Sequence, residues 1–68
     1  MLAIRIKEER IRKGLTQKQV ADVLGIPLKT YKNYEAIGAG RRMPDSDMIG
    51  RIAVALETTT DYLILGRE

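Results

Sequence analysis

The segment from Leu15 to Glu35 restricts the fold more than any other part of this sequence. Thr16 and Gln19 stand in the Ser/Thr-x-x-Glu/Gln relation of a capping box, in which each side chain bonds the backbone N–H of the other at a helix start. Gly25 suits the left-handed residue that ends such a helix, and Pro27 has a backbone angle preset for the start of another. The segment therefore predicts two short helices joined by a tight turn.

A helix pair joined so tightly has the layout of a helix-turn-helix, in which the second helix stands at the surface and can enter a DNA major groove. Here the second helix is expected to end near Ala36. Tyr31 and Tyr34, with Ile37 beyond them, follow one side of it at helical spacing, and core packing is the simpler interpretation of both tyrosines. The other side carries Leu28, Lys29, Lys32 and Asn33.

Three further helical segments are expected outside this pair. The first runs from Leu2 to about Lys13, and its apolar positions are Leu2, Ala3, Ile6 and Ile11. Asp45 can cap the next helix, whose inward positions are Met48, Ile49, Ile52, Ala53 and Leu56. Thr59 can cap a last helix, which holds Tyr62, Leu63 and Leu65. Strand-like alternation is missing, so the predicted fold class is all-α, a compact five-helix bundle in one domain over residues 1–68.

Absent residue types exclude several kinds of chemistry. The sequence has no cysteine and no histidine, which rules out disulfides, thiolate metal sites and histidine acid/base catalysis. It has no phosphate-cradling glycine motif and no nucleophile paired with a base, so we expect no enzyme, no cofactor and no metal. It lacks an apolar run of about 18 residues and a signal peptide, which favours a cytoplasmic protein without a membrane partner. No small-molecule ligand is evident.

The net charge of +3 hides an asymmetry along the chain. Residues 1–44 contain ten Lys or Arg and four Asp or Glu, a net charge of +6, whereas residues 45–68 contain two and five, a net charge of −3. The basic part coincides with the predicted helix pair, so a polyanion is a natural partner for that face. The alternative is that these charges only keep the surface soluble.

Taken in order, these residues resemble the phage-repressor and Cro type (XRE-like) of helix-turn-helix domain, a family of small five-helix DNA-binding proteins. The resemblance covers nearly the whole chain. It is carried by Arg10 ahead of GLTQ, by QKQVA at 17–21, by Gly25 in the turn, by Glu35, by RRMP at 41–44 and by IAVALETTTDYL at 52–63.

The resemblance implies a role for each group of residues. The positions that reach base edges in the family correspond to Leu28, Lys29, Lys32 and Asn33. The positions that hold phosphates correspond to Arg12, Thr16, Gln17, Lys18, Arg41 and Arg42. For Gln17 the alternative is an ordinary polar residue of a first helical turn, for Leu28 it is packing onto the turn, and either lysine can hold a phosphate instead of reading a base.

Two further roles are structural. Arg10 and Glu35 resemble a paired arginine and glutamate that tie the first helix of the family to the third. The chain shows no separate dimerisation domain, so a dimer would use its own surface, with Tyr62, Ile64 and Leu65 as the candidate interface. End-of-core packing is the alternative for these three residues.

The chain departs from the family pattern at both ends of the second predicted helix. Pro27 stands where the family has a capping Ser or Thr, so a capping oxygen is lost. The loop over residues 36–40 is a few residues longer than usual in the family. Arg41 and Arg42 stay phosphate candidates because paired arginines on a glycine-containing loop can follow a DNA backbone.

The resemblance implies a sequence-specific double-stranded DNA-binding transcriptional regulator. We expect a repressor that binds a near-palindromic operator as a homodimer, at least on DNA, with recognition helices about 34 Å apart. The alternative is a protein-interaction or antitoxin-type module that uses the same fold. The salt dependence of binding would separate the two functions.

Overall fold

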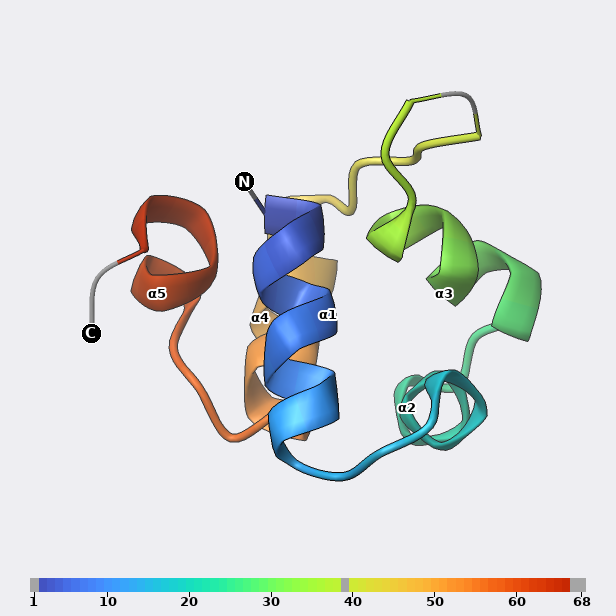
Figure 1. The fold of residues 1–68 in the computed structure, drawn as a ribbon, viewed down its shortest axis with the longest axis horizontal. Helices are drawn as coiled ribbons and strands as arrows, with labels where there is room; N and C mark the ends of the chain where they lie inside the picture. Colours follow the sequence, from blue (N-terminus) through green and yellow to red (C-terminus); the bar gives the residue numbers. More distant parts are fainter. Residues whose placement is uncertain (1, 39, 67–68) are drawn as a thin grey trace.

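The computed structural model describes residues 2–38 and 40–66, and these form five helices without a strand. The helices are α1 (Leu2–Arg12), α2 (Gln17–Leu24), α3 (Leu28–Glu35), α4 (Ser46–Ala55) and α5 (Thr60–Leu65). In Figure 1, α1 lies in front of α4, α5 lies on one side of them, and α2 and α3 lie on the other. The predicted all-α, five-helix fold is confirmed.

Helix α2 has the ends that the sequence predicts. The Thr16 hydroxyl accepts the N–H of Gln19 at 3.0 Å, and the Gln19 side chain accepts the N–H of Thr16 at 2.8 Å, which completes the capping box. At the other end Gly25 is left-handed, with φ +71°, and its amide bonds back to the Asp22 carbonyl at 3.1 Å. Both ends of α2 therefore satisfy backbone groups that a helix terminus would otherwise leave unpaired.

Two glycines give a matched test of this turn. A Cβ at Gly25 or at Gly50 meets no described atom within 4 Å, but only Gly25 has a positive φ, whereas Gly50 lies inside α4. We expect Gly25→Ala to lower the free energy of unfolding by about 1 kcal/mol, because an L residue is strained there. Gly50→Ala should raise it by about 0.5 to 1 kcal/mol, because alanine favours a helix. Urea unfolding measures both; equal effects would mean that the turn conformation is not the cause.

The core joins all five helices. Tyr31 and Tyr34 face inward from α3 as their spacing predicts, and their rings meet edge to face with centroids 6.5 Å apart. Asp45 and Thr59 cap α4 and α5 through the amides of Met48 and Tyr62. The largest fully buried side chains are Ile6, Val20, Tyr31, Ile52, Leu56 and Leu63.

Some residues differ from their predicted environment. Ile11 and Ile37, expected on apolar faces, are 58% and 60% exposed, because Ile11 lies on the outer side of α1 and Ile37 lies beyond the end of α3. Conversely, Glu9 is buried on α1, where its carboxylate accepts from Arg12 Nη1 at 3.4 Å.

Among the described residues, no helix is long and apolar enough to cross a membrane.

Arg5 makes a long-range contact that was not predicted from the sequence. Its Nη1 donates to the carbonyl oxygens of Leu63 at 3.3 Å and Ile64 at 2.9 Å, at the end of α5. The last carbonyls of a helix have no partner within the helix, and a guanidinium there also complements the helix dipole. Arg5 therefore ties the last helix to the first, and this use of a positive charge is structural.

Candidate nucleic-acid interface

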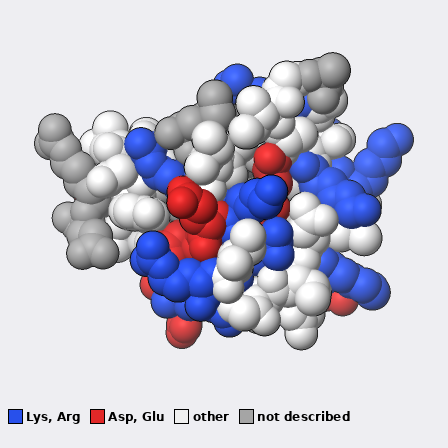
Figure 2. Space-filling model, viewed as in Figure 1, with Lys and Arg blue, Asp and Glu red and all other residues white. Residues whose placement is uncertain are grey.

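The outer face of α3 carries the four residues that the sequence assigns to base edges. Lys29 and Lys32 are exposed, and Asn33 is half-buried. Leu28, assigned to a base edge with packing as the alternative, is half-buried and packs against the core, so only part of its side chain is open to a thymine methyl. Figure 2 shows basic side chains over α2 and α3 and also over α1, with uncharged and acidic side chains between them.

The start of α2 lies next to this face and places the phosphate candidates differently from one another. Thr16 is exposed and its oxygen caps the helix, which leaves its O–H as a donor. Lys18 is exposed, with its Nζ 3.5 Å from a carboxylate oxygen of Asp22. The Arg12 side chain is 62% exposed, but it forms an ion pair with the buried Glu9. Lys18 is thus the freer of the two cations.

The loop after α3 returns to the end of that helix. The amide of Arg42 donates to the Asn33 carbonyl at 3.0 Å, and the amide of Arg41 donates to the Gly38 carbonyl at 3.1 Å. Gly38 and Gly40 both have positive φ, at +89° and +85°, which explains why this tight path contains glycines. Both arginines are exposed, so the loop holds two cations next to the end of α3.

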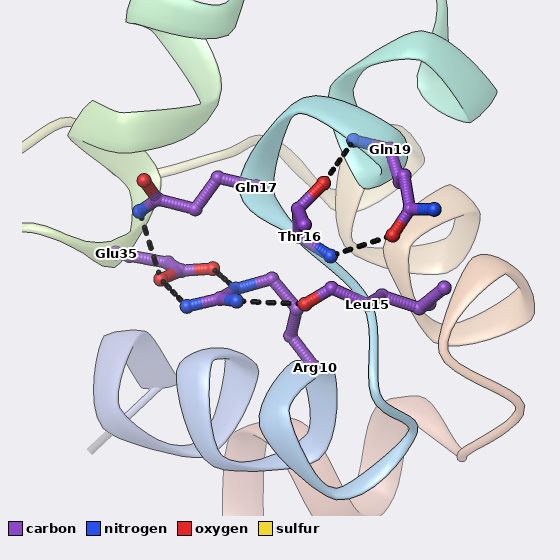
Figure 3. A network of polar contacts seen from close by, with 6 residues as sticks. All are labelled: Arg10, Leu15, Thr16, Gln17, Gln19 and Glu35. Atoms are coloured by element: carbon purple, nitrogen blue, oxygen red, sulfur yellow. Dashed lines mark hydrogen bonds and ion pairs between the residues drawn. The ribbon is translucent and has the colours of Figure 1, made fainter.

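A buried ion pair joins α1 to α3 behind this surface, and Figure 3 shows it from close by. Arg10 Nε donates to Glu35 Oε2 at 2.7 Å and Arg10 Nη2 donates to Oε1 at 3.2 Å, with side-chain exposures of 12% and 3%. Arg10 Nη1 also donates to the Leu15 carbonyl at 2.8 Å, just before α2. The hydrogen bond to Glu35 raises the pKa of Arg10 against the opposing effect of burial.

Gln17 belongs to the same network. Its Nε2 donates to Glu35 Oε1 at 3.1 Å, so a side chain from the first turn of α2 reaches the last residue of α3. From the sequence, Gln17 was predicted to hold a phosphate and Glu35 to pair with Arg10, and the contact between Gln17 and Glu35 was not predicted. The available sequence signal was that Arg10, the expected partner of Glu35, stands shortly before Gln17 in the chain.

Tyr31 lies next to the pair. Its side chain is fully buried, and its hydroxyl has no hydrogen-bond partner within the described part of the chain. Burial raises the pKa of Tyr31 strongly, and the nearby Glu35 carboxylate raises it further. Tyr31 therefore stays neutral and acts in the core, and it is closed to stacking on a base.

The candidate dimer residues occupy α5, on the side of the bundle away from α3 (Figure 1). Ile64 and Leu65 are 52% and 61% exposed, whereas Tyr62 is half-buried and packs against the core. A shallow depression of about 260 Å³ beside them is lined by Ser46, Ile49, Thr60 and Ile64. Two exposed aliphatic side chains next to a depression form a small apolar surface.

A capped short helix, a left-handed glycine turn and an exposed basic helix define the helix-turn-helix class of protein. In agreement, residues 6–63 match the sequence model of the helix-turn-helix family. The chain belongs to this family, and the resemblance to its phage-repressor and Cro type is confirmed.

Curated relatives are similar over most of this chain. The SPbeta prophage-derived HTH-type transcriptional regulator YonR of Bacillus subtilis is 35% identical over 66 residues, 97% of this chain and 58% of its own. The cryptic phage CTXphi transcriptional repressor RstR of Vibrio cholerae is 39% identical over 59 residues, 87% of this chain and 50% of its own. The HTH-type transcriptional regulator ImmR of Bacillus subtilis is 36% identical over 63 residues, which are 93% of this chain and 47% of its own.

The chain therefore spans about half the length of the curated relatives it matches. No solved structure matches it significantly.

Proposed function

We propose that this chain is a sequence-specific double-stranded DNA-binding regulator of transcription, acting as a repressor. The observation that carries the proposal is that exposed cations occur at the start of α2, on the outer face of α3 and on the loop that follows α3. The exposed cations at the family's DNA-binding positions include Lys18, Lys29, Lys32, Arg41 and Arg42. The names of relatives as transcriptional regulators and repressors support the same function.

The proposal divides the surface into two kinds of contact. Lys29, Lys32 and Asn33 project from the helix that would enter the major groove, where lysine can donate to guanine and asparagine can bind adenine through two hydrogen bonds. Gln17, Lys18, Arg41 and Arg42 flank that helix and would hold the DNA backbone, which positions the helix but carries no sequence information. Leu28 has a smaller part, because it is half-buried.

We further propose that the protein binds a near-palindromic operator as a homodimer. Ile64 and Leu65 are exposed on α5, away from the basic surface, so a dimer through them would leave both recognition helices free. Two such helices need to lie about 34 Å apart to reach successive major-groove faces. Symmetry of the operator would then mirror the symmetry of the dimer.

Selection of bound duplexes from a random DNA pool, combined with a sizing measurement of the complex, tests the proposal. We expect enrichment of an inverted repeat with half-sites about one helical turn apart and two chains per duplex. Enrichment of a single half-site with one bound chain would exclude the dimer. Recovery of DNA without any common sequence would exclude specific recognition.

Alanine substitutions should separate base contacts from backbone contacts. We expect Lys29→Ala or Asn33→Ala to weaken operator binding by about 1 to 3 kcal/mol and to relax the preference at one base position. Arg42→Ala and Gln17→Ala should weaken binding to every duplex alike, because phosphates are the same in all sequences. Affinities for the operator and for each single-base variant measure this difference. If all four variants lost affinity equally for every duplex, these residues would contact only the DNA backbone and would not read bases.

A further inference from the structure

The Glu35 carboxylate is the point at which three helices and their polar side chains meet. Its Oε1 accepts from Arg10 Nη2 at 3.2 Å and from Gln17 Nε2 at 3.1 Å, while its Oε2 accepts from Arg10 Nε at 2.7 Å. The three side chains come from α1, α2 and α3 (Figure 3). A pair that only tied α1 to α3 would need no contact with the start of α2.

The carboxylate decides which way the Gln17 amide faces. An ionised carboxylate only accepts hydrogen bonds, so the glutamine must direct its NH₂ group, and not its carbonyl oxygen, toward Glu35. One N–H is then used and the second is left to donate elsewhere. Gln17 is only half-buried and directly precedes the exposed Lys18, so part of its side chain is open to solvent.

Fixing a glutamine in advance has a measurable advantage. A free glutamine loses rotamer freedom when it binds a phosphate, and holding it beforehand recovers about two- to tenfold in affinity. Arg10 makes this arrangement compatible with DNA, because it neutralises a carboxylate that would otherwise repel a phosphate.

We propose that Glu35, held by Arg10, is a positioning residue for the phosphate contact of Gln17. The buried ion pair then acts on DNA affinity through the orientation of the Gln17 amide, in addition to joining α1 to α3. This inference rests on the proposed function, since it needs Gln17 to contact DNA.

A coupling experiment tests the inference. Gln17→Ala is introduced into the wild type and into Arg10→Met/Glu35→Met, in which no buried charge is left unpaired. Affinity is measured on the selected operator and on an unrelated duplex, at a temperature where circular dichroism shows every variant folded. We expect the affinity lost on Gln17→Ala to be about two- to tenfold smaller in the double-methionine background, on both duplexes. If the double-methionine variant does not fold, Glu35→Asp replaces it as the background. Aspartate keeps the negative charge, but its shorter side chain moves the carboxylate away from Gln17.

Lys18→Ala is the matched control. Lys18 is the next residue on α2, is exposed, and pairs with Asp22 outside the Glu35 network. The affinity lost on Lys18→Ala should be the same in the wild-type and double-methionine backgrounds, whatever the size of that loss. An equal change in the Gln17 and Lys18 losses would show a general effect of the ion pair on folding, and it would overturn the inference.

A second readout needs no DNA. In the free wild-type protein, the side-chain amide protons of Gln17 should show NMR shifts and exchange distinct from those of exposed glutamine, and the double-methionine variant should abolish the difference. Ordinary exposed-glutamine behaviour in the wild type overturns the inference. An unchanged Gln17→Ala loss in the variant background also overturns it and leaves the proposed function intact. A wild type that binds neither duplex overturns the proposed function and this inference with it.

Discussion

Glu35→Ala is expected to lower the free energy of unfolding by about 3 to 5 kcal/mol, because it leaves the Arg10 guanidinium buried without its counter-charge. The Arg10 side chain is only 12% exposed, and two of its hydrogen bonds end on Glu35. A domain of 68 residues has roughly 3 to 10 kcal/mol of stability in total. The variant should therefore lose most of its cooperative unfolding transition at 25 °C, as followed by circular dichroism in urea.

Two further variants identify the cause. Arg10→Met/Glu35→Met should be milder than Glu35→Ala, because replacing a buried pair with apolar side chains leaves no stranded charge. Asp22→Ala breaks the exposed Lys18–Asp22 pair, whose side chains are 73% and 66% exposed, and should change stability by at most about 0.5 kcal/mol. An unchanged unfolding midpoint for Glu35→Ala would show that the Arg10–Glu35 pair contributes nothing to the fold.

Operator affinity is expected to fall about 10³-fold between 50 and 200 mM salt. Within the described residues, three exposed cations suited to phosphates have no buried acidic partner, namely Lys18, Arg41 and Arg42. A dimer would then neutralise about six phosphates, and log affinity should fall with log salt at a slope near −5. Titrations of a labelled operator at four or more salt concentrations give this slope.

Charge-specific variants keep this second prediction sharp. Arg42→Ala should make the slope shallower by about 2 per dimer, one for each protomer. Gln17→Ala should lower affinity but leave the slope unchanged, because its amide is neutral and displaces no counterion. A flat salt response in the wild type would contradict a DNA partner and favour the protein-interaction function.

The ends and faces of the helices could be predicted from the chain because the forces that set them are local. Thr16, Asp45 and Thr59 each bond an amide three residues away, and Gly25 takes a backbone angle that other residues avoid. Periodicity likewise identified Tyr31 and Tyr34 as core residues. Ile37 was misassigned, because α3 ends at Glu35 and helical spacing has no meaning beyond the end of a helix.

The sequence therefore determined the fold class, the turn and the chemistry that the exposed helix offers, since helix caps, apolar spacing and side-chain charge act within a few residues. Only the tertiary structure decided how the charges are used. Arg5 donates to a carbonyl at the end of α5, and Leu28 packs partly against the core. Glu35 accepts hydrogen bonds from both Arg10 and Gln17. These contacts join residues 18 to 59 positions apart, and they depend on how the helices pack, which no local pattern encodes.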